Sequence, residues 1–457
     1  MTTTETSSTE QRQAKLLDCA IAAIEEGGEA GLRVQEVARE AGLSVSAIYH
    51  RFGSRQGLVE AAQERRFIST WSDIVRRDLT GLEMIITTAK DQDQLRSMLS
   101  KMGDNVAGAE RAPGRVKRMT IIGSAVTQPG LRQIIADFYR DYGAAVANLH
   151  HKAMHEGLFR ADFNPELVGA WLHAQLFGRV TGDIGHPLVS EGPTNSIRRK
   201  AIRWLYFGEA YSTSPQHESN IDEESEQWRN VVPNSAEAVT LAPPDSTATT
   251  VDGEVDLTDV EMHHTGRRIL RRVMDHLDNA SEGTLRLREI AHDESLSETV
   301  IHRHFGSREG LLTAAHTERF RQYVPYEPDR FAQIVHACAT AAEFQTILAV
   351  MIRVRLGREN LMNRRRRLNA LAAITGRPTL ADNLVHLMHE EALAYAEAFE
   401  AAKSKGWIRD DVDSVAFARW LTSIEMSQVL LEMSELDTDL SSWTDMVIDF
   451  SNALLQP

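Results

Sequence analysis

The chain has 457 residues, a length that predicts two to four compact domains. It carries a net charge of −15 and only two cysteines, Cys19 and Cys338, so a disulfide framework is not expected and a reducing cytoplasm is the expected compartment. No apolar run approaches the roughly 18 residues of a membrane span, and the polar start lacks the hydrophobic core of a signal peptide. Apolar residues recur at three- and four-residue spacing while alternating Val, Thr and Tyr runs are nearly absent, which predicts an all-α fold.

The stretch Leu32–Leu58 predicts two short helices joined by a tight turn and followed by a third helix. Val34 and Val37 recur at helical spacing in the first of them. Gly42 offers the left-handed turn between the two helices, and Ser44 is placed to cap the second. This arrangement is a helix-turn-helix.

The second short helix has an inward and an outward face. Ile48 and Phe52, four residues apart, anchor it inward. The outward face carries small or hydrogen-bonding side chains, namely Val45, Ser46, Ala47, Tyr49 and His50. Such side chains can meet base edges and phosphates in a major groove. Arg51 and Arg55 bracket the start of the next helix, whose N-terminal amides add positive potential for a phosphate.

One ungapped block carries a family resemblance. It contains Val37-Ala38, Ala41-Gly42-Leu43-Ser44, Ile48-Tyr49, Arg51-Phe52 and Ser54-Arg55, and an amphipathic helix near Leu16–Ile24 precedes it. The block resembles the DNA-binding domain of TetR-family (tetracycline-repressor-like) transcriptional regulators. Arg33 stands where the family often has a capping Ser or Thr, and we expect it to provide a phosphate contact instead.

The block occurs twice. Residues Arg33–Phe67 return as Arg286–Phe320 at a constant shift of 253, and landmarks such as Trp171 return later, as Trp420, at a shift of 249. We therefore expect two tandem units. The expected parts are a disordered lead-in (1–9), a DNA-binding domain (10–68), a helical ligand-binding and dimerisation body (69–212), an acidic flexible linker (213–261), a degenerate second DNA-binding domain (262–320) and a second body (321–457).

The second motif departs from the first on its reading face. Gly42 becomes Ser295, which must take up a left-handed conformation or change the turn, and Val45 becomes Glu298. A carboxylate can accept from cytosine but also repels phosphate. The candidate contacts in this motif are Arg286, Ser297, Glu298, Thr299, His302, Arg303 and Arg308. Either the second motif reads DNA specifically, or it serves as a scaffold or a non-specific clamp.

The predicted linker holds most of the negative charge. Residues 213–261 contain twelve Asp or Glu side chains against the single Arg229. The remainder of the chain is therefore close to neutral and can be locally basic, as a DNA-binding surface requires. The segment is also rich in Ser, Thr and Pro, a composition typical of a flexible tether.

The first body supplies candidates for ligand binding. The resemblance implies a pocket whose ligand shifts the spacing of two paired reading heads and releases DNA. Tyr142, His173 and Phe177 are the polar-tipped or aromatic candidates, with ordinary core packing as the alternative. His150, His151 and His155 lack a further ligand at diagnostic spacing, so surface histidines are favoured over a metal site. The run Arg364–Arg367 is either a second contact to the DNA backbone or a solvated helix face with intramolecular carboxylate partners.

These observations predict a cytoplasmic transcriptional regulator, a repressor, that binds double-stranded operator DNA and is released by a small-molecule effector. The two units are expected to form an intramolecular pseudo-dimer, with a homodimer of the tandem chain as the alternative. A ligand- or protein-binding module without active DNA-binding heads is the alternative function. No catalytic set, cofactor or metal is predicted, so an enzyme is not expected.

Overall fold

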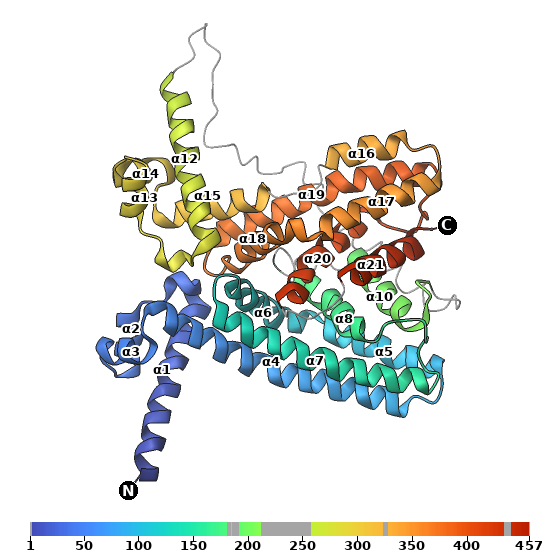
Figure 1. Ribbon diagram of the computed structural model, residues 1–457, viewed down its shortest axis with the longest axis horizontal. Coiled ribbons are helices and arrows are strands. Elements are labelled where there is room, and N and C mark those ends of the chain that lie inside the picture. The colour runs from blue at the N-terminus through green and yellow to red at the C-terminus, as the bar shows by residue number, and fades with distance from the viewer. Residues whose placement is uncertain are drawn as a thin grey trace. The chain divides into compact units, whose positions relative to one another are not determined.

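The computed structural model describes residues 2–180, 184, 192–211, 257–322, 328–433 and 440–456. Every regular element in these ranges is a helix, which confirms the all-α prediction (Figure 1). Most of the segment predicted as an acidic linker (213–261) lies outside the described residues, since residues 212–256 are not described. Among the helices of the described ranges, none combines the length and the apolar character needed to cross a bilayer.

Residues 10–68, here called head 1, contain most of α1 (Thr2–Gly31), α2 (Val34–Ala41), α3 (Val45–Phe52) and the beginning of α4 (Arg55–Thr88). α1 begins at Thr2 and so includes most of the lead-in (1–9) that we expected to be disordered; residues 2–9 contain no Gly or Pro that would end a helix. Each helix turns its apolar stripe into one core. That core includes Leu16, Ala20, Ile24, Val37, Ile48, Leu58 and Ala62.

Two larger helical parts follow the two motifs. Body 1 (69–212) contains the rest of α4, α5 (Gln92–Ala107), the 3₁₀ turn η1 (Ala109–Arg111), α6 (Ala112–Ala125), α7 (Pro129–His155), α8 (Glu166–Gly178) and α10 (Gly192–Phe207). Body 2 (321–457) contains α16 (Pro328–Ala337), α17 (Ala341–Leu356), η3 (Arg358–Asn360), α18 (Leu361–Ala372), α19 (Pro378–Ser404), α20 (Ser414–Met433) and α21 (Leu440–Leu455). The pairs α5 and α17, η1 and η3, and α7 and α19 each begin and end 249 residues apart. The helix boundaries therefore repeat with the spacing of the sequence landmarks.

One helix of the first unit has an interrupted counterpart. α4 runs without a break through 34 residues, from head 1 into body 1. At the corresponding place, α15 (Arg308–Arg321) ends before α16 begins at Pro328. Pro325 and Pro328 lie between or at these ends, and proline is tolerated in the first turn of a helix but disrupts its interior. The offset in residue number between corresponding positions of the two units changes from 253 to 249 in this interval.

The chain divides into two compact units. The first comprises residues 1–213 together with 316–457, and the second comprises residues 214–315. Head 1, body 1 and body 2 thus belong to one unit, whereas most of the second motif lies in the other. The reason is that body 1 and body 2 share hydrophobic cores.

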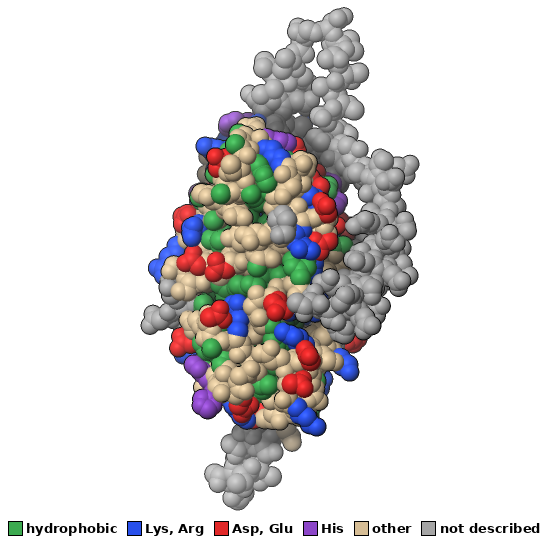
Figure 2. Space-filling view, turned by 90° about the vertical axis from the view of Figure 1, so that its right-hand side faces the viewer, with side chains coloured by type: hydrophobic (Ala, Val, Ile, Leu, Met, Phe, Trp, Pro, Cys, Tyr) green, Lys and Arg blue, Asp and Glu red, His purple; other side chains and the backbone are tan. Residues whose placement is uncertain are grey.

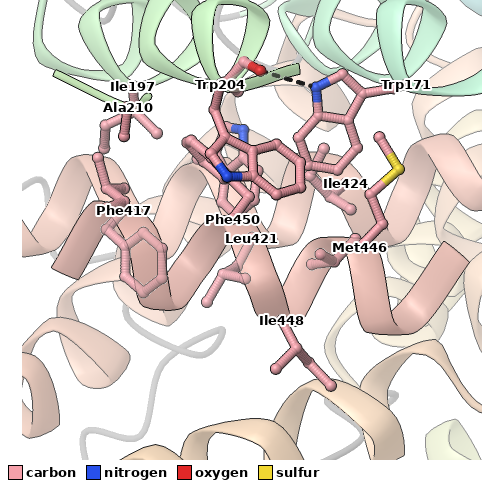
Figure 3. Close-up of a cluster of buried hydrophobic side chains, with 14 of the residues drawn as sticks. Trp171, Ile197, Trp204, Ala210, Phe417, Leu421, Ile424, Met446, Ile448 and Phe450 are labelled. Carbon is pink, nitrogen blue, oxygen red and sulfur yellow. Dashed lines mark hydrogen bonds between the residues drawn. The ribbon is translucent and has the colours of Figure 1, made fainter. Parts of the chain in front are cut away.

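The shared core is a bundle of α8, α10, α20 and α21, which lie together in Figure 1. Trp171 from body 1 contacts Trp420, Trp443 and Phe450 from body 2, with ring centroids 5.7 to 6.2 Å apart. Figure 3 shows these helices meeting around Trp171, Trp204 and Phe450. The Trp420 indole also donates to the Gln175 amide oxygen at 2.9 Å across the same contact. The buried aromatic side chains therefore give the two bodies a common hydrophobic core.

Small residues allow the two bodies to approach closely at two further places. A Cβ on Gly123 of α6 would come within 2.7 Å of the Leu368 carbonyl oxygen of α18 and would also collide with Ala372. A Cβ on Gly178 would come within 2.6 Å of the Ser423 Cβ of α20. At the corresponding contact, the Ser427 hydroxyl lies 3.2 Å from the Ala174 carbonyl oxygen and donates to it. Each helix pair therefore depends on a small residue contributed by body 1.

The second unit contains the repeat of the helix-turn-helix, here called head 2 (262–320). It contains most of α12 (Leu257–Asn279), η2 (Glu282–Thr284), α13 (Leu287–Asp293), α14 (Glu298–Phe305) and nearly all of α15. Its core includes Ile269, Val273, Leu277, Leu285, Ile290, Ile301 and Leu311. Several of these positions match the core of head 1, for example Ile301 and Ile48, so the same inward pattern folds the same three-dimensional motif.

Acidic and basic side chains are interspersed on the face of the molecule in Figure 2. Among the residues coloured there, no extended surface of one charge is visible. A mixed surface of this kind attracts a polyanion weakly.

Candidate functional sites

The turn of head 1 has the geometry that the sequence predicted. Gly42 adopts φ 72° and ψ 34°, a left-handed conformation that favours glycine. The Leu43 amide donates to the Ala38 carbonyl at 2.9 Å and closes α2. The Ser44 hydroxyl accepts from the Ala47 amide at 3.1 Å and caps α3. These contacts confirm the predicted turn and cap, and they fix the direction in which α3 leaves α2.

α3 buries one face and exposes the other. Ile48 is fully buried and Phe52 is half-buried against the head 1 core. The exposed face consists of Ser46, Ala47, Tyr49, His50 and Arg51, with Val45 half-buried at its edge. Tyr49 keeps 41% of its surface accessible. An exposed phenol among short side chains is well placed to touch a base edge or a phosphate.

The three candidate arginines of head 1 lie in different environments. Arg33 is the N-cap residue of α2 without a side-chain cap, and its exposed Nε lies 3.9 Å from the Glu36 carboxylate. The exposed Arg51 guanidinium donates to the side-chain oxygen of Gln13. Arg55 is half-buried, and its Nε donates to the Leu32 carbonyl at 3.0 Å. Its Nη2 donates to the backbone carbonyl of Glu29. Arg55 therefore stabilises the connection between α1 and α2, a role that we did not predict. Its contact with DNA stays a prediction.

The geometry of head 1 agrees with a comparison to known proteins. Residues 16–62 match the family model described as "Bacterial regulatory proteins, tetR family". Head 1 is a TetR-family helix-turn-helix domain. The match runs from Leu16 in α1 to Ala62 in α4, so it covers the whole core of this TetR-type head.

Curated relatives support the same assignment over a similar length. The HTH-type transcriptional regulator BetI of Burkholderia cenocepacia (strain HI2424) is 35% identical over 68 residues, and that of Burkholderia mallei (strain NCTC 10229) is 34% identical over 68 residues. Each match covers 15% of this chain and 35% of the relative. The chain thus matches about a third of the length of these relatives. The likeness concerns a TetR-type head and leaves the bodies to be judged by their own residues.

The turn of head 2 keeps its shape at a cost. Ser295, which replaces Gly42, has φ 57° and is the one residue other than glycine with a positive φ among the described residues. The left-handed conformation costs a residue with a side chain roughly 1–2 kcal/mol. The Ser297 side chain makes no cap hydrogen bond, whereas its counterpart Ser44 does. Of the two possibilities left open by the sequence, the structure therefore has the strained turn rather than a different one.

The acidic residues beside this turn are paired within head 2. The Arg268 Nε donates to the Glu294 carboxylate at 3.0 Å, and the Arg272 Nε donates to the Asp293 carboxylate at 3.1 Å. Both arginines come from α12, and their counterparts in head 1 are Lys15 and Cys19. This pairing offsets two of the negative charges near the reading face. Glu298 lies exposed at the start of α14.

The other candidates of head 2 are partly engaged in the fold. The Arg308 Nη2 donates to the Glu282 carbonyl at 2.5 Å, which repeats the contact of Arg55 with Glu29. Arg286 donates to the Gly283 carbonyl at 3.1 Å. His302 has its Nδ1 3.3 Å from the Gly306 carbonyl. The candidates that lie exposed on or beside α14 are Ser297, Glu298, Thr299, His302 and Arg303.

The three ligand candidates of body 1 lie in different places. Tyr142 borders a cavity of about 80 Å³ and a smaller one of about 30 Å³, and His173 borders only the smaller one. Phe177 borders neither cavity and is fully buried, with the Arg118 guanidinium 5.8 Å from its ring. Tyr206 borders the larger cavity but was not among our candidates. Only the assembled helices show which buried aromatic residues line a cavity.

His173 is a buried polar side chain surrounded mainly by aromatic rings. Its ring contacts those of Tyr139 and Tyr142, with centroids 4.7 and 4.5 Å away. The Gly169 carbonyl lies near the ring, yet neither ring nitrogen has a hydrogen-bond partner of normal geometry among the described residues. Burial, together with the charge of Arg118, lowers its pKa well below the usual value, so the ring is neutral. Burial raises the pKa of Tyr139 to about 12, so this hydroxyl stays protonated and able to donate.

Two further expectations are corrected. His150 is buried rather than on the surface, and its Nδ1 lies 2.8 Å from the Val146 carbonyl, while His151 and His155 are exposed as expected. Arg364 and Arg367 are buried rather than solvated, although they do have the intramolecular carboxylate partners that the sequence suggested. These partners lie on other helices and were not identifiable from the run of arginines itself.

Proposed function

We propose that the protein is a transcriptional regulator that binds double-stranded operator DNA through head 1 and acts as a repressor. The observation that carries this proposal is the exposed face of α3 on a TetR-family helix-turn-helix domain. Tyr49, Ser46 and Ala47 are the proposed base-reading residues, with Val45 at the edge of that face. Arg33, Ser44, His50 and Arg51 are the proposed phosphate contacts, and Arg55 supports them by holding the fold.

Body 1 and body 2 are proposed to act as an intramolecular pseudo-dimer. A DNA-binding homodimer places two recognition helices about one helical turn apart. In this chain, the aromatic bundle between α8 and α20 would replace the contact between two subunits. Because head 1 and head 2 differ on their reading faces, the operator would be asymmetric. The competing arrangement is a homodimer with four heads, and sedimentation decides between a particle of 51.1 kDa and one of twice that mass.

A small-molecule effector is proposed to release the DNA. α4 carries core residues of head 1, such as Leu58, and Leu82, which borders the larger cavity in body 1. A ligand in that cavity can therefore bias the position of head 1 through one continuous helix. A few kcal/mol of difference in ligand affinity between the two positions is enough to change DNA binding.

DNA binding is tested by fluorescence anisotropy with the region upstream of the protein's own gene, at several salt concentrations. Tyr49→Ala should weaken binding about 5- to 100-fold, because it removes a base or phosphate contact while leaving the core intact. Met84→Ala, at an exposed position of α4 outside the head, should leave affinity unchanged. Equal affinity of the wild type for this DNA and for random DNA, or an unaffected Tyr49→Ala, would reject the proposal.

Head 2 is tested in the same assay. If it reads sequence, His302→Ala and Glu298→Ala should change affinity for the specific site more than for random DNA. If it is a clamp, Arg303→Ala should weaken both equally and reduce the salt dependence.

A further inference from the structure

The larger cavity lies entirely within body 1. It is bordered by residues of α4, α5, α7, α8 and α10, and its volume is about 80 Å³. Most of its wall is aliphatic, including Leu82, Leu99 and Leu176. The hydroxyls of Tyr142 and Tyr206 provide polar groups, and neither has a hydrogen-bond partner among the described residues. An apolar wall with two free hydroxyls is typical of a site for a small organic molecule.

A carboxylate at the edge of this cavity is already neutralised. Asp78 borders the cavity, and its carboxylate accepts from the Arg111 guanidinium at 3.1 Å. A cationic ligand would have to compete with Arg111 for it. Arg118, which interacts electrostatically with Tyr142, stacks on the Trp71 ring at 4.0 Å, and its Nε has no hydrogen-bond partner among the described residues. The local charge therefore favours a ligand oxygen that accepts hydrogen bonds over a positively charged group.

Several of the equivalent positions of body 2 carry larger or charged side chains, whereas Ile202 and Tyr206 correspond to the smaller Ser451 and Leu455. At a shift of 249, Gly103 corresponds to Ile352, which is 1% exposed. Tyr142 corresponds to Glu391 and Leu176 to Glu425, and both carboxylates are buried. Leu82 corresponds to Phe331, which is fully buried.

These two carboxylates are joined by buried arginines. The Arg355 Nη2 donates to Glu425 at 2.5 Å, to Glu391 at 3.1 Å and to the Thr422 hydroxyl at 3.2 Å. Arg367 donates to both oxygens of Glu391. In the ion cluster of Arg355, Arg367, Glu391 and Glu425, the two carboxylates thus stand at positions whose counterparts line the cavity of body 1. A neutral ligand could enter only by leaving buried charges unpaired, which is strongly unfavourable.

We infer that the chain has one effector site, in body 1, and that body 2 is closed to ligands by its ion cluster. The ligand is a small, mostly apolar molecule, about the size of one ring, with an oxygen that accepts from Tyr142 or Tyr206. The cavity is smaller than the roughly 150 Å³ that accommodates benzene elsewhere, so a side chain must move on binding. Met102, a flexible and half-buried residue of the wall, can provide this movement.

The site is tested by isothermal titration calorimetry of the full chain with phenol as the probe. One phenol per chain is expected. Gly103→Ile introduces the side chain that body 2 has, at a place where a Cβ meets no atom within 4 Å, so the helix should tolerate it while the cavity fills. Phenol affinity should fall at least tenfold. Tyr206→Phe should lower it about three- to tenfold through loss of one hydrogen bond.

Tyr395→Phe is the matched control, since Tyr395 is a buried tyrosine of body 2 that contacts the ion cluster. It should leave phenol binding unchanged. Two phenol molecules per chain, no phenol binding, or full affinity in Gly103→Ile would overturn the inference. The ligand site itself is independent of the proposed function, and only the regulation of DNA binding by the ligand rests on it. If phenol binds as expected but never releases DNA, the site stands and the release mechanism fails.

Discussion

Body 1 and body 2 share the boundaries of three element pairs, α5 and α17, η1 and η3, and α7 and α19, but differ in the residues that fill their interiors. Body 1 has a cavity beside Tyr142, whereas body 2 has Glu391 at that position, clasped by two arginines. The two heads differ in a similar way, with Gly42 in the relaxed turn and Ser295 in the strained one. Similar folds thus hold different interiors and different turns. A cavity needs small or apolar residues on several helices at once, so a few exchanges suffice to close it.

The largest expected effect breaks the ion cluster of body 2. Glu391→Ala would leave Arg355 and Arg367 buried with too few partners and should lower the free energy of unfolding by about 3–5 kcal/mol. Glu390→Ala, at the exposed neighbouring position, should change it by less than about 0.5 kcal/mol. Urea denaturation followed by circular dichroism measures both. Equal effects of the two variants would show that the cluster contributes no specific stabilisation.

The second prediction concerns the contact between the bodies. Gly123→Ala should destabilise the chain by about 1–3 kcal/mol, because the new methyl group meets Ala372 and the Leu368 carbonyl. Gly114→Ala on the same helix meets nothing within 4 Å and should stabilise by about 0.5–1 kcal/mol. Thermal unfolding of the two variants therefore should shift in opposite directions. A shift in the same direction would contradict the close approach of α6 and α18.

Acid distinguishes the two bodies. In body 1, burial lowers the pKa of His150 to about 4, so the stabilisation that is complete above the ordinary value of 6.5 is lost as the pH falls towards 4. Between pH 7 and pH 5, the titration of His150 alone should lower the free energy of unfolding by about 2 kcal/mol. In body 2, burial raises the pKa of Glu391, but the charges of Arg367 and Arg355 lower it by more. The pKa of Glu391 therefore lies below its ordinary value. Its contribution is therefore lost only below the ordinary value of 4.5.

Urea unfolding at pH 7, 5 and 4 measures this difference. His150→Phe should flatten the decline between pH 7 and 5, with the remaining decline coming partly from His173, whose pKa is also lowered by burial. His151→Phe is the control, since His151 is the exposed neighbour. An unchanged slope in His150→Phe would show that this ring does not titrate as described.

The smallest effect exchanges the turn residues of the heads. Ser295→Gly should stabilise head 2 by about 1 kcal/mol, because it relieves the left-handed strain. Gly42→Ser should destabilise head 1 by a similar amount. Amide hydrogen exchange in α13 and α2 reports each head separately. If Ser295→Gly slows no exchange in α13, strain in this turn has no energetic consequence.

Local patterns predicted head 1 well. The turn at Gly42 and the cap at Ser44 follow from contacts between residues a few positions apart, and Ile48 follows from helical periodicity. The interior of the bodies was harder to predict. Arg367 pairs with Glu391 24 positions away, and Arg364 pairs with Glu432 68 positions away, so the partners become apparent only after packing. Gly103 was missed because an unfilled volume leaves no mark in the sequence of any one helix.

The contacts of Gly178 with Ser423 and of Ala174 with Ser427 set a rule for which halves can pair. In each contact, body 1 contributes the smaller residue and body 2 contributes a serine. Two copies of body 2 meeting through this face would bring serine against serine, where even a single added Cβ at position 178 comes within 2.6 Å of Ser423. Two identical subunits share every substitution, whereas covalently joined halves can become complementary. The contact thus disfavours the pairing of two copies of body 2 and accommodates body 1 beside body 2.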